Sequence, residues 1–566
     1  QPSQAHTLGA ERRLSRVLRS SWAATMMLGR SMQAMGGGGA GHAVRWATQC
    51  GATVLCSRAA AVRGAQGHHH YHSSPHQTAA SRISAVGRRS LSSPAKAEGG
   101  VAVIGAGLAG SLLAVFLRRR GYTVEVYEQL ADPRRGIRGA GRSINLVLTS
   151  RGLDALEAAG SEVLAAVEAI TVPVFGRVLH STNGATTVQH YGPDRSHFNL
   201  SVSRSELNAT LMNAAEAAGA TLHFGAAVSS LELLCPGATG PRLAVDGTRV
   251  RPDHIFGVDG AASPTRKAVV AAAATGTAAA PTSDETVPLG TSYKELSMQS
   301  LPGGQPAMAA DMLHIWPRGE HFLMGLANRD GSFTMTLYLP DTGPVSFEAL
   351  DSDTKVEAYF KEHYADALPH MPHYLDEFQA NPTGFLGTLR CAPWHAGGDA
   401  VLLGDAAHAI TPFFGQGCNC AFEDVRALDR LMETAAGGPG QVPIGAMPDV
   451  FAAYDVERKP NGDAIASLAL DNYSEMASRT ADPRFLLAKE VELRLAREIP
   501  GYASRYTLVT HTLVPYAVCH AAGKLQAEIL EQLVDGIETA DEVDMELAAE
   551  LIEAELGPLL RTVAAT

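Results

Sequence analysis

Residues 101–128 constrain the fold more than any other part of the sequence. They read VAVIGAGLAGSLLAVFLRRRGYTVEVYE, in which a short apolar run is followed by Gly105, Gly107 and Gly110. An apolar-periodic segment typical of a helix comes next, and a second β-branched run covers residues 123–127. This order predicts a βαβ unit with a nucleotide-binding turn, and therefore an α/β fold built on a parallel sheet.

The three glycines have separate tasks in such a turn. Gly105 permits the tight turn, Gly107 lets the backbone approach a pyrophosphate, and Gly110 lets the helix pack closely on the strand. The helix N-terminus then faces the phosphates. Glu128 ends the second strand, where a carboxylate accepts hydrogen bonds from a ribose and repels the 2′-phosphate of NADP, which favours FAD or NAD. The glycine pattern alone is weak evidence in a chain with 56 glycines, but the strands, the helix and the acid around it agree with it.

The composition indicates a large globular protein with an acidic body. The chain has 566 residues, of which 46% are hydrophobic and 18% charged, enough for a large core divided into two or more lobes. Residues 1–99 contain 12 Arg and Lys but only Glu11 and Glu98 as acids, so the remainder carries 34 basic and 56 acidic residues. This excess of acid argues against nucleic acid and against an anionic membrane surface as partners. The seven cysteines form no CxxC pair, which indicates a reducing compartment and no metal site.

Residues 1–98 differ from the body. They are rich in Arg, Ala, Ser, Gly and His, and residues 11–30 fit a basic amphipathic helix. This composition is typical of an organelle transit peptide, so we expect import into mitochondria, with a plastid as the alternative. A disordered tail without a targeting function is the competing interpretation.

Three separated motifs occur in an order that is typical of one enzyme class. They are GAGLAG at 105–110, GVDGAASPTR at 257–266 and LLGDAAHAITPFFGQGCNCAFED at 402–424. In these features the chain resembles the class A flavoprotein monooxygenases over residues 100–460. The resemblance implies that the first motif holds the AMP half of FAD. It also implies that the strand ending in Asp259 supports the pyrophosphate and contacts NADPH, and that Asp405 holds the ribityl chain.

Further motifs resemble the kynurenine 3-monooxygenase family. They are RSINL at 142–146, LSVSR at 200–204, LHIWPR at 313–318, PFFGQG at 412–417, NYSEM at 472–476 and YTLVT at 506–510. The resemblance implies that Arg177 and Tyr191 clamp a substrate carboxylate, and that Asn472 and Tyr506 also line the substrate pocket. An arginine suits this task because its guanidinium binds a carboxylate through two parallel hydrogen bonds.

An apolar wall for the substrate ring is expected from Phe413 and Phe414. The residues expected to contact FAD are Gly105, Gly107, Leu108, Gly110, Tyr127, Glu128, Arg142, Val147, Arg204, Val228, Asp259, Asp405, Gln416, Gly417, Cys418 and Asn419. Because the flavin performs the oxidation chemistry, no side chain is assigned as an acid or base. His408 and Gln416 are the polar candidates near the flavin.

The motifs and the periodicity divide the body into three parts. Residues 99–285 and 386–470 are expected to form a discontinuous Rossmann-like FAD-binding domain, and residues 286–385 an antiparallel β-sheet substrate lobe. Residues 471–566 are expected to form a C-terminal helical region with an acidic amphipathic end. No run of about 20 apolar residues occurs, so no transmembrane helix is expected, although animal members of the family carry a hydrophobic C-terminal anchor.

The resemblance implies an FAD-dependent enzyme that consumes NADPH and O₂ and converts L-kynurenine to 3-hydroxykynurenine, in tryptophan degradation and de novo NAD synthesis. Two alternatives remain. One is another class A hydroxylase that acts on a phenol or a quinone precursor and needs no carboxylate clamp. The other is a flavin-bound interaction protein without turnover.

Overall fold

The computed structural model describes residues 100–136, 144–192, 195–233, 240–275, 281–475 and 482–564. The chain divides into two compact units, Gln1–Ala95 and Lys96–Thr566. The expected transit segment, residues 1–98, and the expected cofactor residue Arg142 lie outside the described residues.

A six-stranded sheet forms the centre of the second unit. Its order is β18 (His395–Ala396), β19 (Ala400–Leu402), β12 (His254–Gly257), β1 (Val101–Ile104), β2 (Val124–Glu128) and β8 (Thr221–Phe224). All neighbours are parallel except β18 and β19. All four residues of β1 are buried, as expected for a central strand of a parallel sheet that helices cover on both faces. The structure therefore confirms the predicted βαβ unit.

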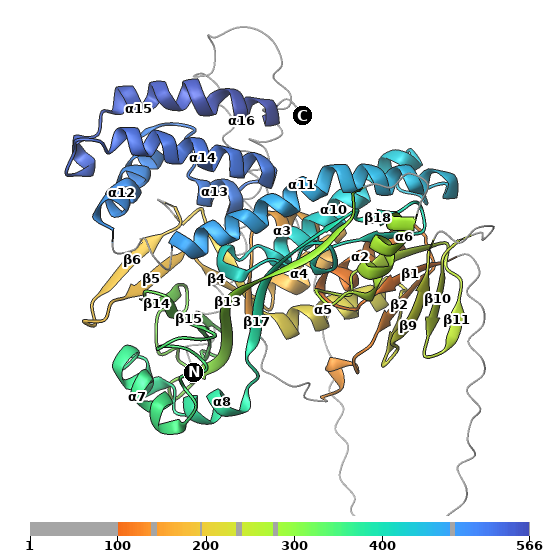
Figure 1. Ribbon diagram of the computed structural model, residues 1–566, viewed down its shortest axis with the longest axis horizontal. Coiled ribbons are helices and arrows are strands. Elements are labelled where there is room, and N and C mark those ends of the chain that lie inside the picture. The colour runs from red at the N-terminus through yellow and green to blue at the C-terminus, as the bar shows by residue number, and fades with distance from the viewer. Residues whose placement is uncertain are drawn as a thin grey trace, which may run out of the picture. The chain divides into compact units, whose positions relative to one another are not determined.

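Helices on this sheet come from distant parts of the chain. Helix α2 (Leu108–Arg119) connects β1 to β2 and packs against α5 (Arg204–Ala217) and α10 (Gly417–Ala436). Helix α10 also packs against α3 (Ser150–Ala159). The motifs at residues 105 and 405 line one cavity, together with the first residues of α2 and α10, two helices that Figure 1 labels.

A seven-stranded sheet forms the lobe. Its order is β17 (Gly384–Ala392), β13 (Ser283–Met298), β16 (Phe333–Pro340), β15 (His321–Ala327), β14 (Leu313–Arg318), β5 (Gly176–His180) and β6 (Thr186–His190). Strand β5 runs parallel to β14, with Arg177 opposite Leu313, and the other neighbours are antiparallel. Strands β5 and β6 lie outside the range 286–385 in which the lobe was expected.

The lobe has its own core. Helices α7 (Asp353–His363) and α8 (Tyr374–Ala380) lie between β16 and β17 in the chain, and α8 packs on β13 (Figure 1). The largest fully buried side chains of this core are Trp316, Phe333, Phe360 and Tyr364. Strands β3 (Asn145–Leu148), β7 (Asn199–Ser203) and β4 (Val172–Val174) form a small sheet of their own, and Val172 of β4 packs against the lobe core.

The remaining elements lie within residues 99–285, the first segment of the expected FAD-binding domain. Helix α4 is Ser161–Glu168, and β9 (Val228–Glu232), β10 (Arg242–Val245) and β11 (Thr248–Val250) form a three-stranded antiparallel sheet. Helix α6 (Pro264–Thr275) contains the Ala-rich run that follows β12.

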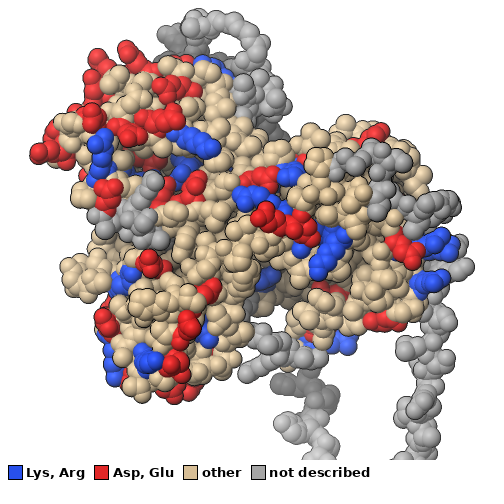
Figure 2. Space-filling model, in the orientation of Figure 1, with Lys and Arg blue, Asp and Glu red and all other residues tan. Residues whose placement is uncertain are grey.

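The C-terminal region is helical, as predicted. It consists of α11 (Met447–Ser474), α12 (Pro483–Glu498), α13 (Arg505–Thr510), α14 (Tyr516–Leu533), α15 (Met545–Leu551), a π-helical turn (Ile552–Leu556) and α16 (Gly557–Ala564). Apolar side chains from these helices share one core, in which Ala548 and Leu556 of the acidic end are fully buried. The acidic side chains gather over the surface of these helices (Figure 2). Within the described ranges, no helix is both long enough and apolar enough to cross a bilayer.

Candidate active site

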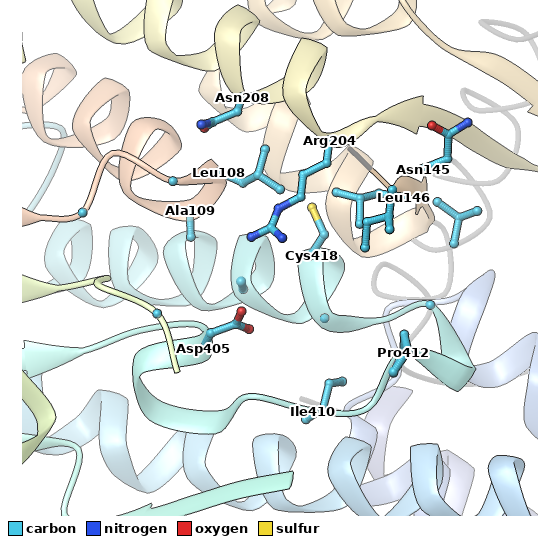
Figure 3. A pocket seen from close by; sticks show the side chains of 18 of the residues that line it. Leu108, Ala109, Asn145, Leu146, Arg204, Asn208, Asp405, Ile410, Pro412 and Cys418 are labelled. Atoms are coloured by element: carbon cyan, nitrogen blue, oxygen red, sulfur yellow. The ribbon is translucent and has the colours of Figure 1, made fainter. Parts of the chain in front are cut away.

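A cavity of about 990 Å³ extends from the glycine-rich turn after β1, past the start of α10, to the lobe sheet. This volume is at the upper end of the range for small-molecule sites, so the cavity has room for an extended ligand. Figure 3 shows its middle part, where Arg204 of α5, Asp405 and Cys418 of α10 surround the same space.

The glycine-rich turn is shaped for close approach. Gly105 has φ of +103°, and a Cβ atom on Gly110 would lie 2.0 Å from the carbonyl oxygen of Gly105, so neither position accepts a side chain without movement of the backbone. A Cβ atom on Gly107 would meet no atom of the described chain within 4 Å, because this residue faces the cavity. The first turn of α2 follows, and the N–H groups of a first helical turn have no acceptor within their own helix and can bind an anion.

Glu128 braces this turn. Its Oε2 accepts a hydrogen bond from the N–H of Ala106 at 2.9 Å, and its Oε1 accepts one from the N–H of Leu130 at 2.8 Å. The carboxylate also lines the cavity. Beside it, Tyr127 stacks on His223 with 5.0 Å between ring centroids, and burial raises the pKa of the Tyr127 hydroxyl to about 12.

Asp259 and Asp405 lie at two further turns of the cavity wall. Asp259 accepts hydrogen bonds from the hydroxyl of Ser263 at 2.5 Å and from the N–H of Thr265 at 3.0 Å, so its carboxylate fixes the start of α6. Asp405 begins the short helix α9 (Asp405–His408) and is exposed to the cavity, with the Arg204 guanidinium directed into the same space (Figure 3). Cation and carboxylate together form a polar middle section of the cavity.

Cys418 is inert at neutral pH. Burial raises the pKa of its thiol to about 12, although Arg204 acts in the opposite direction. The protonated thiol is a poor nucleophile. Its sulfur lies in the cavity wall as a small apolar contact (Figure 3).

Gly110, Gln416 and Asn419 do not line the cavity. Asn419 is fully buried, accepts a hydrogen bond from the N–H of Thr149 at 2.8 Å and donates to the carbonyl oxygens of Val147 and Gly415. Gln416 is also fully buried and accepts a hydrogen bond from the Tyr516 hydroxyl at 2.8 Å. Both side chains hold cavity segments in place from behind, and the other described residues that we expected to contact FAD lie in the cavity wall.

His408 points away from the cavity into a buried ion-pair network. Its Nε2 lies 2.5 Å from Oδ2 of Asp424, the same oxygen accepts a hydrogen bond from the N–H of Gly404, and Oδ1 pairs with Arg458 at 2.8 Å. Burial alone would lower the pKa of His408, but the Asp424 carboxylate raises it. The network fixes the turn that carries Asp405.

The far end of the cavity contains a guanidinium and two stacked tyrosines. The rings of Tyr191 and Tyr506 stack with 5.3 Å between centroids, and the guanidinium carbon of Arg177 lies 5.7 Å from the Tyr506 ring centroid. In the described part of the chain, the buried Nε of Arg177 has no hydrogen-bond acceptor. We call Arg177, Tyr191 and Tyr506 the Arg–Tyr cluster. Its cation and hydroxyl donors suit a carboxylate ligand. Burial raises the pKa of the Tyr191 hydroxyl well above its ordinary value, so this hydroxyl stays protonated and able to donate.

Aromatic side chains form the wall next to this cluster. The Phe414 ring stacks on Tyr506 with 5.9 Å between centroids, and Phe413 contacts Tyr338 of β16 with 5.4 Å. Asn472 donates a hydrogen bond to the carbonyl oxygen of Phe413 at 2.7 Å and so holds this loop against the cavity. The sequence reasoning missed several lining residues of β14, β15 and β16, namely Leu313, Ile315, Met324, Thr334, Thr336 and Tyr338. The alternation of apolar residues in these strands was a usable signal for a buried face, but not for which ligand that face meets.

The fold and the cavity define an FAD-binding flavoprotein, and comparison with known proteins agrees. The family model described as an FAD binding domain matches residues 98–294 and 349–469. Among solved structures, the fold is similar to 2-methyl-3-hydroxypyridine-5-carboxylic acid oxygenase, with a TM-score of 0.52, 20% identity and coverage of 69% of this chain and 95% of that one. It is also similar to PqsL of Pseudomonas aeruginosa, with a TM-score of 0.54, 20% identity and coverage of 68% and 98%.

Two relatives are more similar to this chain in sequence than these solved structures are. The kynurenine 3-monooxygenase of Myxococcus xanthus is 43% identical over 465 residues, which is 81% of this chain and 96% of the relative. The kynurenine 3-monooxygenase of Stenotrophomonas maltophilia is 40% identical over 467 residues, covering 82% of this chain and 99% of the relative. The chain belongs to the kynurenine 3-monooxygenase family of FAD-dependent monooxygenases.

Proposed function

We propose that this protein hydroxylates L-kynurenine to 3-hydroxykynurenine with FAD as cofactor and NADPH and O₂ as cosubstrates. The observation that supports this substrate most directly is the Arg–Tyr cluster at the end of the cavity. A buried guanidinium nitrogen without a partner is costly, so its presence in the wall favours a ligand that supplies an acceptor. A neutral phenol or a quinone precursor has no carboxylate to do so.

The residues that would hold FAD follow the cavity from the turn to the lobe. The backbone around Gly107 and the first turn of α2 would hold the pyrophosphate, Glu128 the ribose, and Asp405 with Arg204 the polar middle of the cofactor. The open space beside Gly107 and the exposure of Asp405 to the cavity both fit this arrangement.

When bound, FAD supplies the reductive activation of O₂, with electrons from NADPH. The amino group on the substrate ring makes the carbon ortho to it electron-rich, so the chain needs no nucleophile of its own. Arg177 and Tyr191, with Tyr506 beside them, would hold the carboxylate and thereby fix the distance of the ring from the flavin end of the cavity. Phe413 and Tyr338 would pack on the ring and exclude water, which limits wasteful release of hydrogen peroxide.

Consumption of NADPH by the FAD-loaded protein tests the proposal. We expect slow oxidation of NADPH alone and a strong increase on addition of L-kynurenine, with 3-hydroxykynurenine formed in proportion. Stimulation by a phenol but not by L-kynurenine would indicate another class A hydroxylase. No substrate-dependent oxidation with any aromatic compound would favour the interaction protein.

We also propose that residues 1–98 direct the protein to mitochondria. The composition supports this proposal, since the first 99 residues contain 12 basic residues and only two acidic ones.

A further inference from the structure

Asn199 is a buried polar residue of the cavity wall. It begins β7, lies opposite Val174 of β4 and has only 3% of its surface exposed. It lines the cavity next to the Arg–Tyr cluster. A buried amide in this place requires a reason, because burial of an amide without hydrogen bonds costs several kcal/mol on transfer to an apolar environment.

The amide of Asn199 serves both tyrosines of the cluster. Its Nδ2 donates a hydrogen bond to the hydroxyl oxygen of Tyr506 at 3.2 Å. Asn199 and Tyr506 both act on the Tyr191 hydroxyl, since Asn199 lowers its pKa as a donor and Tyr506 raises it. The stacking of the two rings, 5.3 Å apart and inclined by 27°, brings the hydroxyl groups together over this amide.

The protons in this arrangement can be counted. An amide nitrogen has two N–H donors, and each tyrosine hydroxyl has one O–H donor. One amide N–H donates to the Tyr506 hydroxyl, the second can donate to the Tyr191 hydroxyl, and one hydroxyl can donate to the other. The second hydroxyl proton then has no acceptor within the group, and Oδ1 of Asn199 does not take it, since this oxygen has no donor among the described residues.

We propose that Asn199 is a positioning residue, which directs the free hydroxyl proton of the tyrosine pair into the cavity so that this proton and Arg177 donate together to the substrate carboxylate. Arg177 and both tyrosines line the cavity, the Arg177 guanidinium carbon lies 5.7 Å from the Tyr506 ring centroid, and the buried Nε of Arg177 has no acceptor among the described residues. The inference rests on the proposed function, because it assumes a substrate with a carboxylate. It adds a residue whose task is to set the direction of a donor, without contact with the substrate.

The identity of the side chain matters for this task. Aspartate has almost the same shape as asparagine but only accepts hydrogen bonds, so Asn199→Asp would capture the free hydroxyl proton and place a second negative charge beside the carboxylate. Leucine has a similar size and neither donates nor accepts, so Asn199→Leu would leave the hydroxyl without a fixed direction.

Steady-state kinetics of Asn199→Leu and Asn199→Asp, each with and without Tyr506→Phe, test the inference. For Asn199→Leu we expect the KM for L-kynurenine to rise about tenfold, as for the loss of one hydrogen bond to a charged group, with kcat and FAD content close to wild type. Asn199→Asp should raise KM further. In the Tyr506→Phe background Asn199→Leu should add little, because residues that act through one another are not additive.

Binding of the amine that remains when the carboxyl group of L-kynurenine is removed provides the matched control. Its dissociation constant should be the same for wild type and Asn199→Leu, whereas a general distortion of the pocket would weaken both ligands. Wild-type KM in both Asn199 variants, or fully additive effects with Tyr506→Phe, would overturn this inference alone. A wild-type protein without turnover of L-kynurenine would overturn the proposed function, and the inference with it.

Discussion

Two glycines of the same turn should respond differently to alanine. At Gly107 the backbone is extended, with φ of −71° and ψ of −172°, and a Cβ atom would meet no described atom within 4 Å. Gly107→Ala should therefore fold normally, and the loss of backbone freedom in the unfolded chain should add about 0.4–1 kcal/mol to the unfolding free energy of the apoprotein. The new methyl group would occupy the space in which the pyrophosphate approaches the backbone, so FAD affinity should fall at least tenfold, which is about 1.4 kcal/mol.

Gly110→Ala should damage both properties. Its Cβ atom would lie 2.0 Å from the carbonyl oxygen of Gly105, where real contacts exceed 3.0 Å, so α2 must move by roughly 1 Å from the turn. Overpacking of this kind costs about 1–3 kcal/mol, and the two atoms that the new Cβ would approach most closely, O and C of Gly105, belong to the backbone. The midpoint of thermal unfolding of the apoprotein should fall, together with FAD affinity.

Calorimetry of the apoproteins and titration of FAD fluorescence measure the two effects separately. Normal FAD affinity in Gly107→Ala would refute the assignment of this turn to the pyrophosphate. An unchanged unfolding midpoint in Gly110→Ala would show that the close contact between helix and turn carries no strain.

Three further predictions concern the substrate end, the lobe and the N-terminal segment. Arg177→Ala should raise the KM for L-kynurenine by roughly 10- to 150-fold, the equivalent of about 1.5–3 kcal/mol for a hydrogen bond to a charged group, while FAD content stays constant; an unaltered KM would remove Arg177 from the site. Burial, with His363 and Arg318, lowers the pKa of His321 to about 4 from 6.5, so the unfolded chain binds this proton first as pH falls. The stability that depends on neutral His321 should thus be fully present above pH 6.5, and the unfolding free energy should decrease by about 1.4 kcal/mol per pH unit from this group between pH 6.5 and 4. When the unfolding free energy is measured by urea at several pH values, its decrease with falling pH should be smaller for His321→Phe than for wild type, and an equal decrease would contradict this prediction. Residues 1–98 fused to a fluorescent reporter should carry it into mitochondria, and a cytosolic reporter would contradict the targeting proposal.

Local patterns predicted the nucleotide-binding core well. The sequence around Gly105 predicted β1, α2 and β2, because glycine spacing and apolar periodicity act within about 30 residues. The parallel sheet and the helical C-terminal region follow from the same kind of information. The acidic end also packs as its periodicity suggested, with Leu556 in the core.

Long-range pairing was not visible in the sequence. Strand β5 pairs with β14, which is far away along the chain, so no local pattern places Arg177 in the lobe sheet. The apolar alternation from residue 313 predicted the strands of the lobe but gave no pairing order. Such contacts depend on tertiary packing.

The direction of a side chain within a motif was equally hidden. Gln416 and Asn419 belong to a flavin motif, yet both turn toward the protein interior and hold neighbouring segments. Asn199 lies directly before LSVS at residues 200–203, where apolar and polar residues alternate, and its hydrogen bond to Tyr506 depends on a residue about 300 positions away. A polar residue in a buried strand is the signal that could have found it.

Incorporation of oxygen from ¹⁸O₂ tests the central claim most directly. The FAD-loaded protein is supplied with NADPH, L-kynurenine and ¹⁸O₂, and the product is analysed by mass spectrometry. We predict 3-hydroxykynurenine with one ¹⁸O atom on the ring and consumption of one NADPH per product. Consumption of NADPH with only hydrogen peroxide formed, or a product without the label, would contradict the account.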